Sequence, residues 1–276
     1  MRSKLFYRVA KLPKYLVLAV VVLWVLVPIY LMIVISVTPA GTTLNGFQLP
    51  NFFTLDHYQW VLFGANVIWP ALTNSAIVTV GATLIALAIA TPAAYALSHM
   101  RHRRIGRNIY LSFFVLRGVP PVALILPFYL IYSGSHLLNT HVGLILALVP
   151  LALPYIVWTL RVFFDAIPAE IEEAANVDGC GTWRTFFTVV LPIARPGIAA
   201  TAILGALQVY VDYIIVATLA GPKTLTFPVY ITGFQLDFLA LVGPLAAASL
   251  IGTLPMIVMF GFSQRYMLRL ATAGIH

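Results

Sequence analysis

The sequence predicts an all-α membrane protein with six transmembrane helices, and three observations carry this prediction. Of the 276 residues, 61% are hydrophobic and 9% are charged, whereas a soluble domain has about 25% charged residues. Six apolar runs are each long enough to cross a bilayer, which takes about 20 residues. The positive charges gather in alternate loops. A chain this apolar cannot cover itself with polar surface, so its solvent is largely lipid.

The six predicted spans follow one another along the chain, and no soluble domain of usable size lies between them. They cover residues 15–36, 70–97, 109–132, 142–160, 198–220 and 238–262. Pro150 and Pro154 interrupt the fourth span and make its limits the hardest to fix. The first span is too long for a signal peptide and lacks a small-residue cleavage site, so we do not expect it to be removed. The sequence thus predicts a single transmembrane domain over residues 1–276.

The distribution of lysine and arginine predicts which loops face the cytoplasm. These residues occur before the first span, in loop 98–108, in segment 161–197 and after the last span, while the loops of the other face contain only Lys223. Cytoplasmic loops carry the excess of lysine and arginine, so we expect a multi-pass protein with both termini in the cytoplasm. The formal net charge of +8 is then a topology signal, and we expect membrane lipid and no nucleic acid as a partner.

The sequence offers little for catalysis or metal binding. The single cysteine, Cys180, excludes an intrachain disulfide. The phosphate-binding pattern G-x-x-x-x-G-K-[ST] is absent, as are H-E-x-x-H and a nucleophile elbow. His99 and His102 lie in a basic loop, where we expect a solvated anchor rather than a metal pair. We therefore predict no catalytic residue, no metal site and no cofactor on this chain.

The polar segment at about 161–197 is the longest predicted cytoplasmic loop. Pro168 suits the first turn of a helix, and the glutamates that follow it oppose the positive end of the helix dipole. Gly179 is placed to end this helix in a left-handed conformation. A short helix is therefore expected over about 168–178.

A second short helix is expected after the glycines. Thr182 suits its N-cap, and Pro192 and Pro196 are expected to end it. One apolar face at helical spacing is formed by Trp183, Phe186, Phe187 and Val190. The residues alone leave two interpretations of the segment open: an amphipathic loop that caps the helix bundle, or a docking surface for a soluble partner.

The same segment resembles the EAA loop of ABC importer permeases, whose pattern is E-A-A-x3-G-x9-I-x-L-P. Glu173-Ala174-Ala175 is followed after three residues by Gly179, and after nine more by Val189 in the isoleucine position, then by Leu191-Pro192. Other stretches resemble the inner permease subunits of maltose-type carbohydrate importers: FTLDHYQWVL (53–62), LTNSAIVTVGAT (72–83), AAYALSHMR (93–101), LPFYLIY (126–132) and SQRYMLRLATAG (263–274).

The resemblance implies a type I ABC importer permease fold with a cytoplasmic helix-turn-helix coupling loop. It implies transport of a carbohydrate, a sugar or oligosaccharide, across the cytoplasmic (inner) membrane of a prokaryote. The implied partners are a second permease subunit in a heterodimer, two ATPase subunits that bind ATP and Mg²⁺, and an extracytoplasmic substrate-binding protein. The residues expected to couple the chain to the ATPase are Glu173, Ala174, Ala175, Asp178, Gly179, Leu191 and Pro192.

Two charged residues lie inside predicted spans, where charge indicates function. Arg117 precedes Gly118, Pro120 and Pro121 in the third span, and Asp212 lies in the fifth. The two form either a structural ion pair or part of the substrate path. The candidate path residues are Arg117, Gln208, Tyr210, Asp212 and Tyr213.

One motif of the fifth span departs from the family. Family members often have Trp-Asn-Asp or Trp-Asn-Glu where this chain has Tyr210-Val211-Asp212. The substrate could therefore be another carbohydrate or a polyol, or be contacted mainly by the partner permease. In the second span, Asn74 is expected to make an interhelical hydrogen bond.

Three alternatives to a carbohydrate importer stay open. A permease of the same architecture could import a non-sugar solute such as a polyol, a polyamine or an anion, and it would keep the same coupling loop. An ATP-independent secondary transporter or channel would usually carry more intramembrane carboxylates than Asp212. An intramembrane enzyme would need a paired nucleophile and base, which the spans lack.

Overall fold

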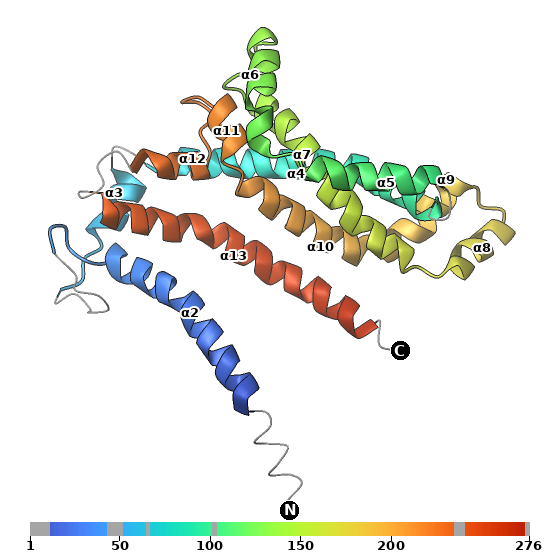
Figure 1. The fold of residues 1–276 in the computed structure, drawn as a ribbon, viewed down its shortest axis with the longest axis horizontal. Helices are drawn as coiled ribbons and strands as arrows, with labels where there is room; N and C mark the ends of the chain where they lie inside the picture. Colours follow the sequence, from blue (N-terminus) through green and yellow to red (C-terminus); the bar gives the residue numbers. More distant parts are fainter. Residues whose placement is uncertain (1–11, 43–51, 65–66, 101–103, 235–240, 274–276) are drawn as a thin grey trace, which may run out of the picture. The chain divides into compact units, whose positions relative to one another are not determined.

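The computed structural model describes residues 12–42, 52–64, 67–100, 104–234 and 241–273, and the regular elements among them are all helices (Figure 1). They form two compact units. Unit 1 comprises Met1–Ile68 and Ile231–Thr253, and unit 2 comprises Trp69–Tyr230 and Leu254–His276. The all-α prediction is confirmed. The candidate functional residues lie in unit 2.

Unit 1 contains α2 (Leu12–Ser36), α3 (Asp56–Phe63) and the beginning of α13 (Val242–Ala273). The ring atom Nε2 of the buried His57 lies 2.8 Å from the carbonyl oxygen of Thr38, and the hydroxyl oxygens of Ser36 and Tyr58 lie 2.8 Å apart. These contacts fix α3 to the end of α2. A Cβ atom at Gly243 would overlap the His57 ring, so this approach of α13 to α3 requires glycine.

The core of unit 2 is formed by α4 (Trp69–His99), α7 (His141–Asp165) and α10 (Leu191–Tyr210). Small residues permit close helix packing in membranes, and α4 buries a row of them. This row is Ala82, Ala86, Ala90 and Ala94, each 0% exposed. A Cβ atom at Gly205 of α10 would lie 2.9 Å from the Ile156 side chain of α7, so α10 approaches α7 closely.

The third predicted span is not one helix. It consists of α5 (Arg104–Arg117), the 3-10 helix η1 (Pro121–Leu124) and α6 (Ile125–Gly134), and α6 runs in a different direction from α5 (Figure 1). Proline has no backbone N–H and clashes with the preceding turn of a helix, so Pro120 and Pro121 account for the break. The span predicted over 109–132 is therefore not a single helix but α5, η1 and α6 in succession.

The fifth span begins earlier than predicted and contains its own break. The helix α9 (Thr182–Thr185) continues through the π-helical segment η2 (Phe186–Val190) into α10, and a short gap separates α10 from α11 (Ile214–Leu219). Thr182 is the first helical residue and Gly181 the N-cap, so the predicted cap is off by one residue.

Pro192 and Pro196 do not end the helix either, because both lie within α10. The wider π turn directly before Pro192 changes the hydrogen-bond register there. The position of Pro192, which has no backbone N–H, therefore falls in the first turn of α10, where proline is tolerated.

Among the described residues, five helices are long and apolar enough to cross a membrane, one fewer than predicted, because the third span is broken. They are Tyr15–Ser36, Trp69–His99, His141–Asp165, Thr182–Tyr210 and Val242–Ser263. The helical segment Pro121–Gly134 is apolar but shorter. Two other short helices are α8 (Ala169–Val177) and α12 (Phe227–Thr232).

Candidate functional site

The predicted polar segment 161–197, called the coupling loop below, runs from the end of α7 to the first turns of α10 and contains the short helix predicted there. α8 begins directly after Pro168 and ends before Asp178. The N–H of Cys180 donates to the carbonyl of Ala175 at 2.9 Å, the N–H of Gly179 donates to Asn176 at 3.0 Å, and Gly179 has φ +80°. This is the left-handed cap expected from the sequence, so helix and cap are confirmed.

The predicted coupling residues divide between two faces of α8. Glu173 and Ala174 are exposed, as are Asp178 and Gly179 in the turn that follows. Ala175 is buried at 6% exposure and faces the rest of unit 2. The exposed face carries the charge, while the buried face is small and apolar.

Leu191 and Pro192 lie apart from that exposed surface. Both are half-buried in the first turn of α10, and Leu191 packs against the hydrophobic core. They fix the start of a membrane helix and do not extend the exposed face of α8.

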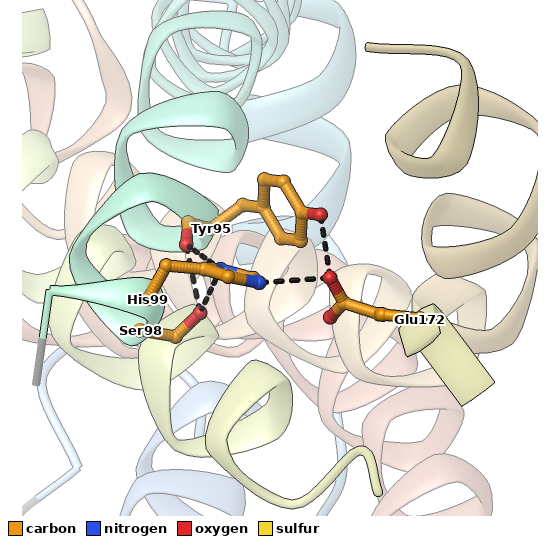
Figure 2. A network of polar contacts seen from close by, with 4 residues as sticks. All are labelled: Tyr95, Ser98, His99 and Glu172. Carbon is orange, nitrogen blue, oxygen red and sulfur yellow. Dashed lines mark hydrogen bonds and ion pairs between the residues drawn. The ribbon is translucent and has the colours of Figure 1, made fainter. Parts of the chain in front are cut away.

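A carboxylate that the sequence did not single out connects α8 to α4. One oxygen of Glu172, Oε2, accepts a hydrogen bond from the Tyr95 hydroxyl at 2.8 Å and lies 2.8 Å from Nε2 of His99 (Figure 2). The other ring nitrogen of His99, Nδ1, lies 3.0 Å from the Tyr95 carbonyl oxygen. His99 is solvent-exposed, as predicted, with 48% of its side chain accessible, but it also pairs with Glu172, which the sequence did not indicate.

The ring of Tyr95 also contacts two other elements. It packs edge-on against Phe164 of α7, with ring centroids 5.7 Å apart, and lies 4.7 Å from the ring of Phe186 in η2. Tyr95 is 7% exposed. Through its ring and hydroxyl, this one side chain of α4 contacts α7, α8 and η2.

A cavity of about 390 Å³ lies between α4, α7, α8 and α9, and three carboxylates line it: Asp165, Glu172 and Glu173. Asn176 adds an amide. Such a wall suits a basic side chain. In the described part of the chain, no group of three or more His, Cys, Asp or Glu side chains is placed to hold a metal ion.

The apolar face predicted for the second loop helix is split between the core and the surface. Phe186 and Val190 are buried at 2% and 0% exposure, whereas Trp183 and Phe187 are 68% and 57% exposed. The exposed rings stack, with centroids 6.2 Å apart and planes at 21°. The π turn of η2 changes the helical register and so breaks the regular spacing on which the prediction depended.

A second cavity, of about 430 Å³, lies where several helices are irregular. Its wall includes Val119 and Pro121 from the break in the third span, Pro150 and Pro154 from α7, and residues at the end of α10. Irregular backbone at membrane depth is tolerated where it is buried in protein or lines a cavity. We call this space the membrane cavity.

Two of the predicted path residues line the membrane cavity, namely Gln208 and Asp212. Phe128 and Tyr155 add aromatic rings to its wall. The sequence analysis missed these two, although their neighbours gave a signal: Phe128 lies in the quoted stretch LPFYLIY, and Tyr155 follows Pro154 directly.

The other candidate path residues lie elsewhere. Tyr210 is buried and stacks on Phe227 with centroids 6.2 Å apart. Tyr213 is 44% exposed and does not line the membrane cavity. Arg117 is the last residue of α5, but its side chain lies outside the described part, so its pairing with Asp212 stays a prediction.

Asp212 has one defined structural role. Its Oδ1 accepts a hydrogen bond from the N–H of Ile215 at 3.1 Å, in the first turn of α11. A carboxylate in this position satisfies a free donor of the helix start. Asp212 therefore caps α11 and also lines the membrane cavity.

The interhelical hydrogen bond predicted for Asn74 is confirmed. Its Nδ2 donates to the carbonyls of Lys223 at 3.1 Å and Leu225 at 3.0 Å, and its Oδ1 lies 2.7 Å from Nε2 of His141. The hydroxyl of Ser75 accepts from the N–H of Phe227 at 2.8 Å. These bonds hold segment 223–227 against the first part of α4.

Comparison with known proteins assigns the chain to a family. The model of the family described as "Binding-protein-dependent transport system inner membrane component" matches residues 86–271. The chain is 33% identical to the diacetylchitobiose uptake system permease protein DasC of Streptomyces coelicolor, over 90% of each chain. It is 31% identical to the trehalose transport system permease protein SugB of Mycobacterium tuberculosis, over 92% of this chain and 93% of that one.

A solved structure has the same fold. It is a crystal structure of a bacterial ABC transporter involved in the import of the acidic polysaccharide alginate, matched with a TM-score of 0.78 at 23% identity. The match covers 94% of this chain and 96% of that one. The helical architecture and the family match agree: this chain belongs to the family of inner membrane components of binding-protein-dependent transport systems.

Proposed function

We propose that this chain is one of two permease subunits of an ABC importer for a carbohydrate, and that α8 is the element through which separate ATPase subunits drive it. The observation that carries the proposal is the exposed face of α8. It presents Glu173 and Ala174 on a short helix that Gly179 ends sharply, and it lies between two helices of membrane-spanning length.

The exposed face of α8 suits a protein partner. Glu173 can pair with a basic residue, and Ala174 permits close backbone approach. Beside them, Val177 is 87% exposed and Trp183 is 68% exposed, and aromatic side chains are enriched where protein interfaces form. This surface combines exposed apolar groups with Glu173, a carboxylate that is unpaired within the described part of the chain, and so favours docking over a loop that only caps the bundle.

The position of α8 explains how docking can drive transport. The chain enters the loop from α7, which ends at Asp165, and leaves it through α9, which begins at Thr182. When two ATPase subunits close on ATP and Mg²⁺, a displacement of α8 tilts the helices at both ends of the loop. In this proposal the chain itself hydrolyses nothing, and the loop and both termini face the cytoplasm.

A carbohydrate is the substrate class that the relatives and the membrane cavity favour. DasC and SugB are named for the uptake of diacetylchitobiose and trehalose. The cavity combines the rings of Phe128 and Tyr155 with the polar groups of Gln208 and Asp212. Rings can stack on the C–H faces of a sugar while the polar groups bind its hydroxyls. An extracytoplasmic binding protein delivers the substrate, and a second permease completes the path.

The coupling proposal can be tested in the assembled transporter. We expect the double variant Glu173→Lys/Gly179→Asp to insert into the membrane but to lose ATPase binding and substrate uptake, because it reverses the docking charge and strains the cap. The measurements are co-purification of the ATPase and ATP-dependent uptake in liposomes. Asp56→Lys, which reverses an exposed charge on α3, is the control and should retain both.

Two results would contradict the proposal. One is full uptake by the double variant. The other is full-rate transport by this chain reconstituted alone, which would indicate an ATP-independent transporter.

A further inference from the structure

We infer that Glu172, Tyr95 and His99 form a mechanical link that carries the displacement of α8 directly into α4. The inference rests on the proposed function, because it assumes that a partner moves α8. The family pattern places the docking carboxylate at Glu173. We assign a different role to the preceding carboxylate, Glu172: it is a positioning residue that connects α8 to α4.

Chain connectivity alone does not join α8 to α4. The loop passes from α7 through α8 to α9, so a force on α8 reaches those helices along the backbone. Glu172 lies 77 residues from Tyr95 and 73 from His99, so α4 can follow α8 only through contacts between side chains. Within the described part of the chain, Glu172 is the one side chain of α8 that makes a hydrogen bond or ion pair with a membrane helix.

The link is firm at its Tyr95 end. Both contacts end on the same oxygen of Glu172, whose side chain is 18% exposed, so water competes weakly for it. Hydrogen bonds to an ionised group are stronger than those between neutral groups. Tyr95 is held by the rings of Phe164 and Phe186, so its hydroxyl cannot shift without moving α4, α7 or η2.

The link also gives α8 a route to the opposite end of unit 2. α4 spans Trp69–His99, with Tyr95 and His99 in its last turns and Asn74 and Ser75 in its first turns. Those first turns hold the backbone of segment 223–227 through three hydrogen bonds, and Asn74 also contacts His141. A displacement that α4 follows therefore acts on that segment as well as on the helices that flank the coupling loop.

The test compares uptake per ATP hydrolysed in the assembled transporter for Glu172→Ala, Tyr95→Phe and the double variant. Tyr95→Phe removes the hydroxyl and keeps the packed ring. We expect each single variant to retain the ATPase subunits and substrate-stimulated hydrolysis, while uptake per ATP falls about tenfold, the size expected for a lost hydrogen bond to a charged group. Because both changes break the same Tyr95–Glu172 hydrogen bond, the double variant should be no worse than Glu172→Ala alone.

A matched control is Glu170→Gln, which changes an exposed carboxylate in the first turn of the same helix and should leave uptake per ATP unchanged. The inference is overturned if the single variants transport at the wild-type ratio, or if their effects multiply in the double variant. It is also overturned if Glu172→Ala loses the ATPase, since Glu172 would then be a docking residue.

These outcomes separate the link from the docking proposal. The docking proposal fails if the Glu173→Lys/Gly179→Asp variant retains ATPase binding and uptake. The link fails if the Glu172 and Tyr95 variants keep the wild-type ratio of uptake to ATP hydrolysis. If Glu172→Ala does not fold, the double variant Tyr95→Phe/His99→Ala decides the question, because it removes both partners of Glu172 and a wild-type ratio in it would overturn the link.

Discussion

The coupling loop exposes its carboxylate Glu173, whereas the membrane cavity encloses the carboxylate Asp212 among apolar and aromatic side chains. Glu173 has no hydrogen-bond partner in the described part of the chain, while Asp212 already caps α11. An exposed carboxylate on a short, sharply ended helix is available to a macromolecule. A half-buried carboxylate in a cavity of about 430 Å³ is available to a small molecule. In the proposed function, this contrast separates the surface that docks the ATPase from the cavity that binds the substrate.

The two regions also differ in how they are stabilised. The coupling loop is held from beneath by the aromatic rings of Tyr95, Phe164 and Phe186. The membrane cavity is bounded by helix breaks at Val119–Pro121 and after Tyr210. Variants should therefore affect the loop mainly through packing and the cavity mainly through polar contacts, and three sets of substitutions can test this difference.

The largest effect is expected from two adjacent phenylalanines of the loop. Phe186 is 2% exposed and Phe187 is 57% exposed. Phe186→Ala leaves a void in the core and should lower the free energy of unfolding by about 3–5 kcal/mol. Phe187→Ala should leave stability nearly unchanged and weaken ATPase retention. Thermal unfolding in detergent and ATPase co-purification measure the two effects, and equal losses of stability would contradict the assigned packing.

At the membrane cavity we expect an effect on transport more than on stability. Asp212→Ala removes both the cap and the charge and should cost about 1 kcal/mol of stability, whereas Asp212→Asn keeps a capping side chain. We expect both variants, and Gln208→Ala, to change uptake and the ranking of competing sugars, with ATPase retention intact. Uptake with a panel of competing sugars measures this, and Gln59→Ala on α3 is the matched control. If Asp212→Asn transports as the wild type does, the carboxylate acts only as a cap.

The most local effect is expected from the glycines that follow α8. A Cβ atom added at Gly179 or at Gly181 would meet no other group within 4 Å, but Gly179 has φ +80° and Gly181 has φ −75°. Gly179→Ser should therefore cost about 1–2 kcal/mol through the left-handed conformation, while Gly181→Ser supplies a favoured N-cap. Faster hydrogen exchange of the α8 amides in Gly179→Ser alone would support this, and equal exchange in both variants would contradict it.

Local signals made the coupling loop predictable. The start and end of α8 depend on Pro168 and Gly179, which act on the backbone within a few residues of their own positions. The apolar runs likewise predicted α4 and α7, because bilayer thickness sets a length that the sequence shows directly. Asn74 was predictable as a polar residue in a membrane helix, although its partners were not.

Contacts between distant segments could not be predicted. Nothing near Glu172 in the sequence indicates that Tyr95, 77 residues away, supplies its hydrogen bond. The prolines at 120 and 121 signalled an irregularity, but they do not encode the direction that α6 takes. The membrane cavity depends on such directions, because breaks in several helices must converge before Gln208 and Asp212 line one space.

The π-helical segment η2 sets the rotational phase between the loop and the membrane helix that follows it. Each residue of an α-helix turns the chain by about 100°, so adding or removing one residue within Phe186–Val190 would rotate α10 by that angle against α9. Gln208 would then leave the cavity wall even though no residue of the wall had changed. The five residues of η2 thus determine which side of α10 faces the membrane cavity.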